Sequence, residues 1–386
     1  MFKRVLESEL RESMTESPAV GLLGPRQVGK TTLAKTIMLS YEDCLYLDLE
    51  RPSDLSKLSN AEYFLANNRN KTIILDEVQR KPDLFPLLRS EIDAHPVPGR
   101  FVLLGSASPE LIRTSAESLA GRIVYHQLSP LLLQEVAHQF SFEDHWLKGG
   151  FPEPLQKRNQ KAGTKWFESF LSSYIERDLP AIGLNTTGVN LYRLFAMLAH
   201  EQGQPENDTK LSLALGVKSP TVKRALDYIE QAFLIRRLPA WFSNAKKRIV
   251  KSPRLYFTDS GLLHHLQNVD SFNDLLGNPN IGFSFEGYCI NQITGNPNMS
   301  AYQFYYYRTQ DGTECDLLAV KNNSIVAAFE FKLTSSPEVT KSMMNSITDL
   351  KPKHFFLVTP QSEVYELQKN IKVCGIESIP DLLKAL

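Results

Sequence analysis

Residues 24–31 constrain the fold of this chain more than any other stretch. Their sequence, GPRQVGKT, fits the phosphate-binding loop pattern G-x-x-x-x-G-K-[ST] at every fixed position. The apolar residues 19–23 before the loop predict a short buried strand, and residues 31–39 after it predict a helix. Such a loop surrounds a phosphate with backbone N–H groups, and the helix N-terminus adds a positive partial charge. The residues predicted to bind the nucleotide here are Gly24, Pro25, Arg26, Gln27, Val28, Gly29, Lys30, Thr31 and Thr32.

A pair of carboxylates adds a second chemical element to this loop. Asp76 and Glu77 directly follow residues 72–75, an apolar run that predicts a strand. Lys30 is predicted to reach the β- and γ-phosphates, while Thr31 and Asp76 are predicted to hold Mg²⁺. Glu77 is predicted to polarise the water that attacks the γ-phosphate. The two motifs together predict Mg²⁺-dependent binding and hydrolysis of ATP.

Three further polar residues are candidates for the same site. Ser106 ends the fourth predicted strand, residues 101–106, and is a candidate to contact the γ-phosphate or the attacking water; the alternative is a turn serine. Arg80 and Arg122 are candidates to stabilise charge on the transferred phosphoryl group, in cis or from a neighbouring subunit. The alternative for each is a surface arginine. We assign Arg122 to the catalytic set together with Lys30 and Glu77.

Strand-like runs alternate with helical patterns over the first 140 residues. The runs are residues 20–23, 45–49, 72–75 and 101–106. Alternation of this kind predicts a parallel sheet covered by helices, because parallel strands need crossover connections. We therefore expect an α/β nucleotide-binding domain over residues 1–140.

The composition of the chain excludes several classes of protein. In 386 residues, 43 Lys and Arg balance 43 Asp and Glu, so no net charge draws the whole chain to nucleic acid or to a membrane. The four cysteines are far apart and lack C-x-x-C spacing, which argues against zinc and disulfides and fits a reducing compartment. No apolar run approaches the length of a membrane span, and the N-terminus lacks the apolar run of a secretory signal. We expect a cytoplasmic protein without a membrane partner.

The motifs together resemble a known family. The segments that carry the resemblance are residues 24–31, 73–80, 103–108 and 119–122. They resemble bacterial and archaeal AAA-type ATPases that carry a C-terminal DUF4143 domain, and the resemblance covers nearly the whole chain. It implies a P-loop AAA-type ATPase domain with ATP and Mg²⁺ as ligands, and it gives Ser106 the position of a polar sensor. AAA-type relatives often act as rings, so the resemblance also implies a possible homo-oligomer of this chain.

Residues 141–188 predict a helical connector after the first domain. Aromatic residues recur there at helical spacing, which is most simply a buried stripe. The pair Arg177-Asp178 in this segment is a candidate for sensing nucleotide, and the alternative is a structural ion pair.

Residues 189–268 predict a winged-helix-like domain. Residues 211–215 predict a helix that ends in a glycine turn, and Ser219-Pro220 predicts the start of a second helix. Two strands around a basic loop follow. A winged helix inserts its second helix into a major groove and lays its loop on phosphates, although such domains also dock proteins or act as ATPase lids. The predicted DNA contacts are Lys223, Arg224, Lys246, Lys247 and Arg248.

Residues 269–386 predict a restriction-endonuclease-like α/β domain. Asp316 opens an apolar strand, and Glu330 and Lys332 stand two residues apart on the next, so both share one face. This order matches the D…E-x-K core of such nucleases. Asp316 and Glu330 are candidates to hold Mg²⁺, Lys332 to activate water, and Glu286 to add a carboxylate. A charged sheet edge, or a binding module without catalysis, is the alternative.

The sequence as a whole predicts a multidomain α/β ATPase. Its nucleotide state is expected to act on a winged-helix and a nuclease-like module, with DNA as the favoured target. Two other functions remain open: a nucleotide-gated switch that binds protein without nucleic acid, and an ATP-regulated, metal-dependent nuclease.

Overall fold

The computed structural model describes residues 2–41, 43–106, 119–181, 183–184, 190–242, 249–361 and 363–386. The chain forms two compact units. The first unit consists of Met1–Ser129, Asp178–Asn185 and Gln231–Phe233. The second unit consists of Pro130–Arg177, Thr186–Glu230 and Leu234–Leu386.

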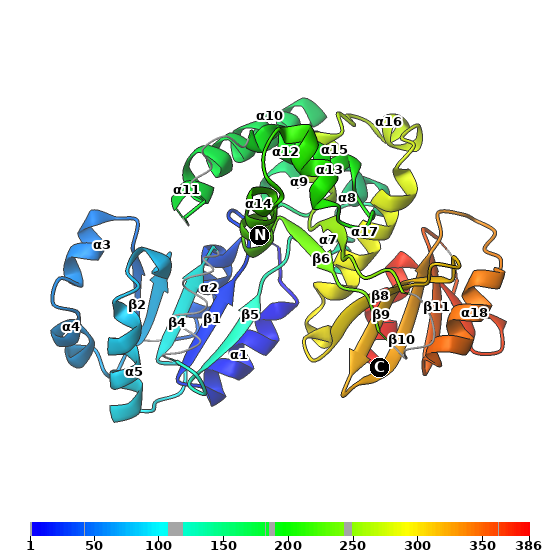
Figure 1. Ribbon diagram of the computed structural model, residues 1–386. Coiled ribbons are helices and arrows are strands. Elements are labelled where there is room, and N and C mark those ends of the chain that lie inside the picture. The colour runs from blue at the N-terminus through cyan, green and yellow to red at the C-terminus, as the bar shows by residue number, and fades with distance from the viewer. Residues whose placement is uncertain are drawn as a thin grey trace. The chain divides into compact units, whose positions relative to one another are not determined.

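The first unit is a parallel sheet with helices on both faces (Figure 1). Its five strands pair in the order β2-β3-β4-β1-β5. The predicted α/β alternation is confirmed, while β5 at the sheet edge was not predicted because polar and apolar residues mix in it. The elements of this unit are α1 (Leu6–Glu16), β1 (Ala19–Leu23), α2 (Lys30–Met38), β2 (Cys44–Asp48), α3 (Pro52–Lys57), α4 (Ala61–Asn67), β3 (Thr72–Asp76), η1 (Val78–Arg80), α5 (Leu84–Ala94), β4 (Phe101–Gly105), β5 (Ile123–Gln127) and α11 (Leu179–Ala181).

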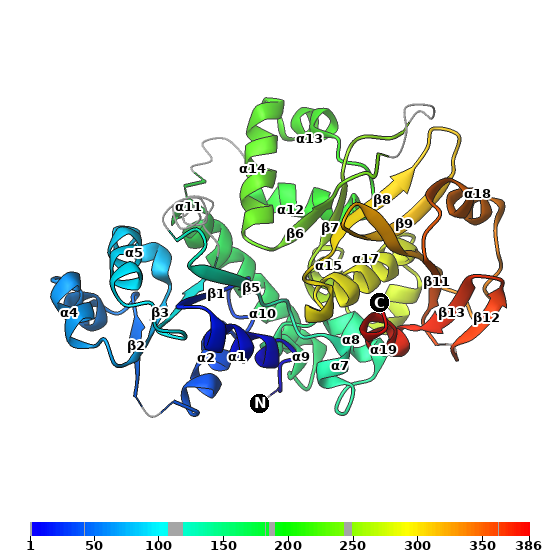
Figure 2. The same ribbon diagram turned by 90° about the horizontal axis from the view of Figure 1, so that it is seen from below.

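Alternating side chains of this sheet feed two separate cores. Val20 and Leu22 of β1 point to the face that α1 and α2 cover, together with Leu10 and Leu33 of those helices. The intervening strand positions pack against α4 and α5 on the other face. Figures 1 and 2 show these helices on opposite sides of the sheet. Apolar residues on both faces explain why the strands read as continuous apolar runs.

The strand order determines which loops meet. Strand β4 lies between β1 and β3, and all neighbouring pairs are parallel. The carboxyl ends of β1, β3 and β4 therefore lie along one edge of the sheet. The loop of residues 24–29 and the pair Asp76-Glu77 both start at this edge.

The second unit holds a bundle of helices and two sheets. Its elements, some of which end in the first unit's segments, are α7 (Leu133–Val136), α8 (Phe142–Lys148), α9 (Pro152–Leu155), α10 (Gln160–Ser173), η2 (Tyr174–Asp178), α12 (Leu191–His200), α13 (Asp208–Leu215), α14 (Ser219–Gln231), β6 (Ile235–Leu238), β7 (Arg254–Phe257), α15 (Ser260–Leu266), α16 (Phe272–Leu276), α17 (Ile281–Thr294), η3 (Pro297–Met299), β8 (Gln303–Arg308), β9 (Glu314–Lys321), β10 (Ser324–Phe331), α18 (Lys341–Leu350), β11 (His354–Thr359), β12 (Tyr365–Gln368), β13 (Ile371–Gly375), η4 (Ile376–Ser378) and α19 (Ile379–Lys384).

The larger sheet of the second unit has the order β12-β13-β11-β10-β9-β8. Strands β8, β9 and β10 form an antiparallel meander, and β11 pairs parallel to β10 after the crossover helix α18. Side chains of α17 share one core with this sheet, and side chains of α18 share another, so the two helices cover its two faces. The elements follow in the order α17–β8–β9–β10–α18–β11. Glu286 lies on α17, Asp316 on β9 and Glu330 on β10.

Helices α12, α13 and α14 precede the two-stranded antiparallel sheet of β6 and β7. Gly216 ends α13 with φ 68°, a left-handed conformation that glycine adopts readily. Residues just after β6 and just before β7 pair with the larger sheet: Trp241 N–H donates to Tyr306 O (2.7 Å), and Val250 N–H donates to Arg308 O (3.0 Å). Trp241 and Val250 thus both pair with the edge strand β8.

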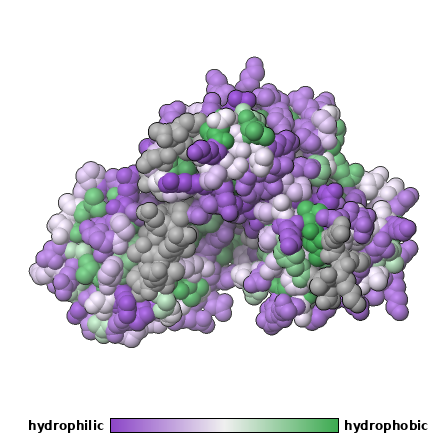
Figure 3. Space-filling model, in the orientation of Figure 1, coloured by the Kyte–Doolittle hydropathy of each residue, from purple (hydrophilic) through white to green (hydrophobic). Residues whose placement is uncertain are grey.

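Within the described ranges, we find no helix with the length and apolar character that a membrane crossing requires. The face of the molecule in Figure 3 is largely hydrophilic, with apolar residues scattered among polar ones.

Candidate functional site

The loop after β1 has the backbone that a phosphate cradle needs. Gly24 and Gly29 have φ of 153° and 104°, and Gln27 between them has φ of 59°. A Cβ at Gly24 would lie 2.4 Å from the carbonyl oxygen of Leu128, so a larger residue there would displace the backbone. The glycines are therefore required by geometry, and the loop leads directly into α2.

Lys30 lies inside this loop. Its ammonium donates to the carbonyl oxygens of Gly24 (2.9 Å) and Pro25 (2.8 Å), and the side chain is buried. Burial lowers the pKa of Lys30 to about 8, although Glu77 and Asp76 favour its charged form. A phosphate at the loop would supply the negative charge that this buried ammonium lacks.

Asp76 joins the two sequence motifs. Its Oδ2 accepts hydrogen bonds from the Thr31 hydroxyl (2.6 Å) and the Tyr46 hydroxyl (2.7 Å). Mg²⁺ in nucleotide sites takes one or two protein oxygens and completes its shell with phosphates and water, and Thr31 and Asp76 fit that donor set. Burial, followed by the bond to Asp76, raises the pKa of Tyr46. Sequence reasoning missed Tyr46, because a tyrosine within a strand carries no signal of a polar role.

Glu77 is held beside the carboxyl end of β4. Its Oε2 accepts from the Ser106 hydroxyl (2.8 Å) and from the side-chain amide of Gln79. Glu77 has φ 54° and ψ 46°, a left-handed conformation that costs a non-glycine residue on the order of 1 kcal/mol or more. The structure thus brings Asp76, Glu77 and Ser106 together, and it adds Gln79, which the sequence analysis passed over.

Arg26 of the loop forms two ion pairs. Its guanidinium contacts Asp178 Oδ1 at 2.7 Å and Glu50 Oε1 at 2.7 Å, and Arg80 contacts the same Glu50 oxygen at 2.8 Å. Burial would raise the pKa of Glu50, but Arg80 and Arg26 together hold it below its ordinary value. Asp178 therefore contacts the phosphate-binding loop itself. Glu50 was not predicted.

Arg122 lies at the opposite edge of the sheet. It precedes β5, and Ala19 at the start of β1 donates its N–H to Arg122 O (3.2 Å). The phosphate loop begins at the other end of β1, roughly 13 Å away at strand spacing. The Arg122 guanidinium contacts Asp93 instead (2.5 and 3.1 Å). A role for Arg122 in its own site is therefore wrong, because the strands separate it from the loop. A role in a second copy stays a prediction.

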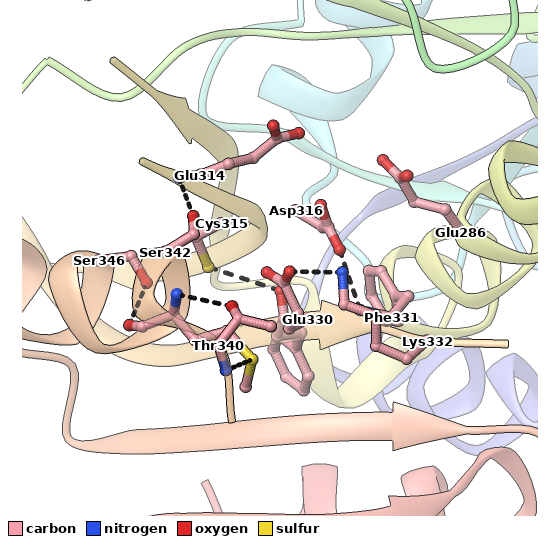
Figure 4. Close-up of polar contacts among 12 residues, drawn as sticks. Glu286, Glu314, Cys315, Asp316, Glu330, Phe331, Lys332, Thr340, Ser342 and Ser346 are labelled. Atoms are coloured by element: carbon pink, nitrogen blue, oxygen red, sulfur yellow. Dashed lines mark hydrogen bonds and ion pairs between the residues drawn. The ribbon is translucent and has the colours of Figure 1, made fainter. Parts of the chain in front are cut away.

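The four residues predicted for a nuclease-like site lie close together in the second unit (Figure 4). Lys332 Nζ contacts Glu330 Oε1 at 2.8 Å, and Asp316 Oδ2 accepts the N–H of Phe331 at 2.9 Å. A register shift between β8 and β9 opposite Asp316 turns its side chain toward α17 and Glu286. Burial, followed by the charge of Asp316, raises the pKa of Glu330 to about 8, and burial also raises the pKa of Glu286.

The second unit also contains a buried cation that was not predicted. Arg254 of β7 contacts Glu286 (3.3 Å), Asp316 (3.9 Å) and, more closely, Glu314. In the part of the chain that the structure describes, no group of three or more Asp, Glu, His or Cys residues is arranged to hold a metal ion. Asp316 accepts a backbone N–H and Glu330 pairs with a lysine, and the binding of Mg²⁺ by these two carboxylates stays a prediction.

The predicted DNA contacts are only partly described. Lys223 and Arg224 lie exposed on α14, and the Arg224 guanidinium is 5.6 Å from the ring of Tyr228. Lys246, Lys247 and Arg248 lie outside the described residues.

Three family models match successive parts of the chain. Residues 16–137 match an AAA domain, residues 139–273 match the domain of unknown function DUF8612, and residues 281–379 match the domain of unknown function DUF4143. A curated relative, uncharacterized protein Rv2008c of Mycobacterium tuberculosis, is 35% identical over 379 residues, which cover 98% of this chain and 84% of the relative. Mb2031c of Mycobacterium bovis matches with the same values.

The comparison with solved structures gave matches of low sequence identity. The Walker-type ATPase PABY2304 of Pyrococcus abyssi has a TM-score of 0.46 at 17% identity, covering 69% of this chain and 96% of that one. RuvB of Thermotoga maritima has a TM-score of 0.32 at 17% identity, covering 61% and 89%. The match to Rv2008c covers 98% of this chain, and the AAA and DUF4143 models match its N-terminal and C-terminal parts. This chain therefore belongs to the AAA-type ATPases that carry a C-terminal DUF4143 domain.

Proposed function

We propose that this chain binds Mg²⁺–ATP and hydrolyses it to ADP and phosphate. The observation that carries the proposal is the 2.6 Å bond between the Thr31 hydroxyl and the Asp76 carboxylate. These residues are 45 positions apart, and their side chains meet where the phosphate loop ends. Thr31 and Asp76 would hold Mg²⁺ there, and the ion would supply positive charge that offsets the charge of the phosphates.

The residues of the chain would divide the work as follows. The loop N–H groups hold the phosphates, and Lys30 exchanges its bonds to two loop carbonyls for the β- and γ-phosphate oxygens. Glu77 orients the attacking water and accepts its proton, while Ser106 holds the Glu77 carboxylate at the end of β4. Arg122 would act only on the site of a neighbouring copy in a homo-oligomer.

The test of this proposal is the variant Lys30→Ala in the full-length protein. We expect ATP turnover to fall by about a hundredfold or more, since the loop loses the ammonium that contacts the β- and γ-phosphates. Lys57→Ala, on exposed α3, is the matched control and should keep wild-type turnover. Unchanged turnover in Lys30→Ala would mean that the ATPase proposal is wrong.

We further propose that nucleotide state acts on DNA through residues 189–268, as a winged-helix-like domain. Support comes from four exposed cations on the helix pair and its turn, namely Lys210, Lys218, Lys223 and Arg224. We also propose that the domains span residues 1–140, 141–188, 189–268 and 269–386. Lys223→Glu with Arg224→Glu should weaken binding to duplex DNA at low salt and flatten its salt dependence.

A specific observation favours a second candidate, a nucleotide-gated switch that binds protein. Leu213 on α13 is 78% exposed beside exposed Ala214, so the first helix of the pair offers an apolar side chain to solvent. If duplex DNA does not bind at low salt with or without ATP, the protein-binding candidate replaces the DNA candidate. Leu213→Ser should then reduce the capture of that partner.

A further inference from the structure

Arg254 is almost fully buried in the second unit. Its exposed fraction is 1%, and its backbone lies in β7, paired with Leu238 of β6. The guanidinium stacks 4.8 Å from the centre of the Tyr306 ring. Because its backbone is paired in a strand and its guanidinium lies against the Tyr306 ring, the charge of Arg254 is held at one place.

Three carboxylates from two elements converge on this charge. Glu286 comes from α17, while Glu314 and Asp316 come from β9. Glu286 accepts a further bond from the hydroxyl of Tyr256, the residue of β7 on the same side as Arg254. Figure 4 shows Glu286 and Asp316 reaching toward the same space from opposite elements. Arg254 offsets part of the negative charge that these three carboxylates bring together.

A second cation lies beside Asp316. Lys332 pairs with Glu330, and both lie next to Asp316 (Figure 4). Glu330 is 5% exposed, yet its Oε2 has no hydrogen-bond partner among the described residues. A buried carboxylate oxygen without a partner is costly, and a cation close by is the usual remedy.

The distances in this cluster suit a guanidinium and not a metal ion. Arg254 contacts Glu286 and Asp316 at 3.3 and 3.9 Å, the range of ion pairs through N–H groups. Mg²⁺ requires oxygens at about 2.1 Å in octahedral geometry, so the carboxylates would have to close on one point. The Arg254 side chain fills the space in which they would do so.

We propose that Arg254 is the resident cation of this cluster and closes it to divalent metal ions. The C-terminal D…E-x-K residues would then form a metal-free polar core, and the nuclease alternative would not apply to the wild-type chain. Removal of Arg254 leaves the carboxylates of Glu286, Glu314 and Asp316 facing one vacated space, and carboxylate oxygens are the ligands that Mg²⁺ and Mn²⁺ prefer. This inference concerns the second unit alone and does not depend on ATP hydrolysis.

The experiment is Mn²⁺ titration of the full-length chain, followed by the electron paramagnetic resonance signal of free Mn²⁺. All variants carry Asp76→Asn, so that the nucleotide site does not contribute. With Arg254 present we expect no Mn²⁺ binding that depends on Asp316. Arg254→Met should bind one Mn²⁺ at least about tenfold more tightly, and adding Asp316→Asn should abolish that gain.

Arg237→Met is the matched control. Arg237 belongs to the neighbouring strand β6 and pairs with Asp227 and Glu230 of α14, so its loss also frees carboxylates. It should gain no Mn²⁺ site. Equal gains in both variants would overturn the proposal, because any freed carboxylate pair would then suffice.

The stability of Arg254→Met gives an independent reading. The variant leaves buried carboxylates without their cation and should unfold at a lower temperature. Millimolar Mn²⁺ should restore that temperature in Arg254→Met and leave the Asp76→Asn background unchanged. Mn²⁺ binding by the background that Asp316→Asn removes would overturn the proposal. So would an Arg254→Met variant that Mn²⁺ neither binds nor stabilises.

Discussion

At the scale of single residues, the candidate ATP site depends on side chains that each make one or two defined bonds. Asp76 receives two hydroxyls, and Glu77 receives one hydroxyl and one amide. Glu77 adopts a left-handed backbone conformation that only its surroundings impose. Strain of this kind tends to occur at functional sites, where a side chain must point in one direction.

The variant Glu77→Gln tests whether the Glu77 carboxylate activates the attacking water. The amide keeps the size of the carboxylate and cannot accept a proton from water, so we expect ATP hydrolysis to fall by about a hundredfold or more. Nucleotide affinity should change by no more than a few fold, because no proposed phosphate contact is lost. Steady-state turnover and titration with a fluorescent ATP analogue measure the two effects. Glu62→Gln, in the first turn of α4, is the control. A parallel loss of affinity and turnover would contradict a role in water activation.

At the scale of elements, the first-unit segment that begins at Asp178 is tied to the phosphate loop. Asp178 pairs with Arg26, and both side chains are largely buried. A nucleotide phosphate that engaged Arg26 would compete with Asp178 and Glu50 for the same guanidinium. The ion pair therefore offers a direct way for phosphate to release Asp178 from the loop.

Asp178→Asn should increase nucleotide affinity. Without the Asp178 charge, Arg26 is freer to contact phosphate, and we expect a gain of roughly three- to tenfold, the range of a partly buried ion pair. Calorimetric titration with ADP and ATP measures it. Glu176→Gln, two residues earlier, serves as control, because Glu176 accepts hydrogen bonds from the hydroxyls of Ser172 and Tyr192. Weaker binding in Asp178→Asn would mean that Asp178 positions Arg26 and does not compete for it.

At the scale of the whole molecule, buried histidines make the second unit sensitive to acid. His145 bonds to Tyr288 and Leu131, and His264 bonds to Ser284 and Leu147, so both imidazoles are neutral and fully bonded. Burial lowers the pKa of each to about 4. Between pH 6.5 and 4 the unfolded chain therefore binds protons that the folded chain does not.

The contribution of these two histidines to the free energy of unfolding should fall across this pH range. Each contributes up to roughly 3 kcal/mol, fully present above pH 6.5 and lost as the pH falls to 4. Buried carboxyls oppose them, since burial raises the pKa of Asp259 to about 6, of Glu206 to about 7 and of Glu330 to about 8, and the folded chain gains protons there. The loss of the histidine contribution is therefore read from the difference in pH dependence between the wild type and a histidine variant.

Tryptophan fluorescence during urea unfolding measures this loss, because Trp146, Trp166 and Trp241 all lie in the second unit. His264→Asn should lower the stability and flatten its dependence on pH between 6.5 and 4. His200→Asn, at an exposed position, should keep the wild-type slope. An unchanged slope in His264→Asn would show that this imidazole titrates normally.

Local patterns carried much of the fold and of the nucleotide site. The glycine loop, the two carboxylates after a strand and the serine after another are contiguous motifs, and they come together because parallel strands end at one edge. Tyr46, Gln79 and Glu50 left no such trace, since their partners are distant in sequence or are shared with ordinary surface residues. Arg122 was misjudged for its own site because sequence distance does not reveal at which end of a strand a residue lies.

The sequence by itself determined that this chain is an AAA-type P-loop protein with a C-terminal DUF4143 domain, because backbone geometry at a phosphate loop demands particular residues at particular spacing. It also gave the order of Glu286, Asp316, Glu330 and Lys332. Only the tertiary structure decided what surrounds them. Arg254 arrives from a strand some 30 residues before Glu286 and about 60 before Asp316, and its guanidinium contacts both carboxylates.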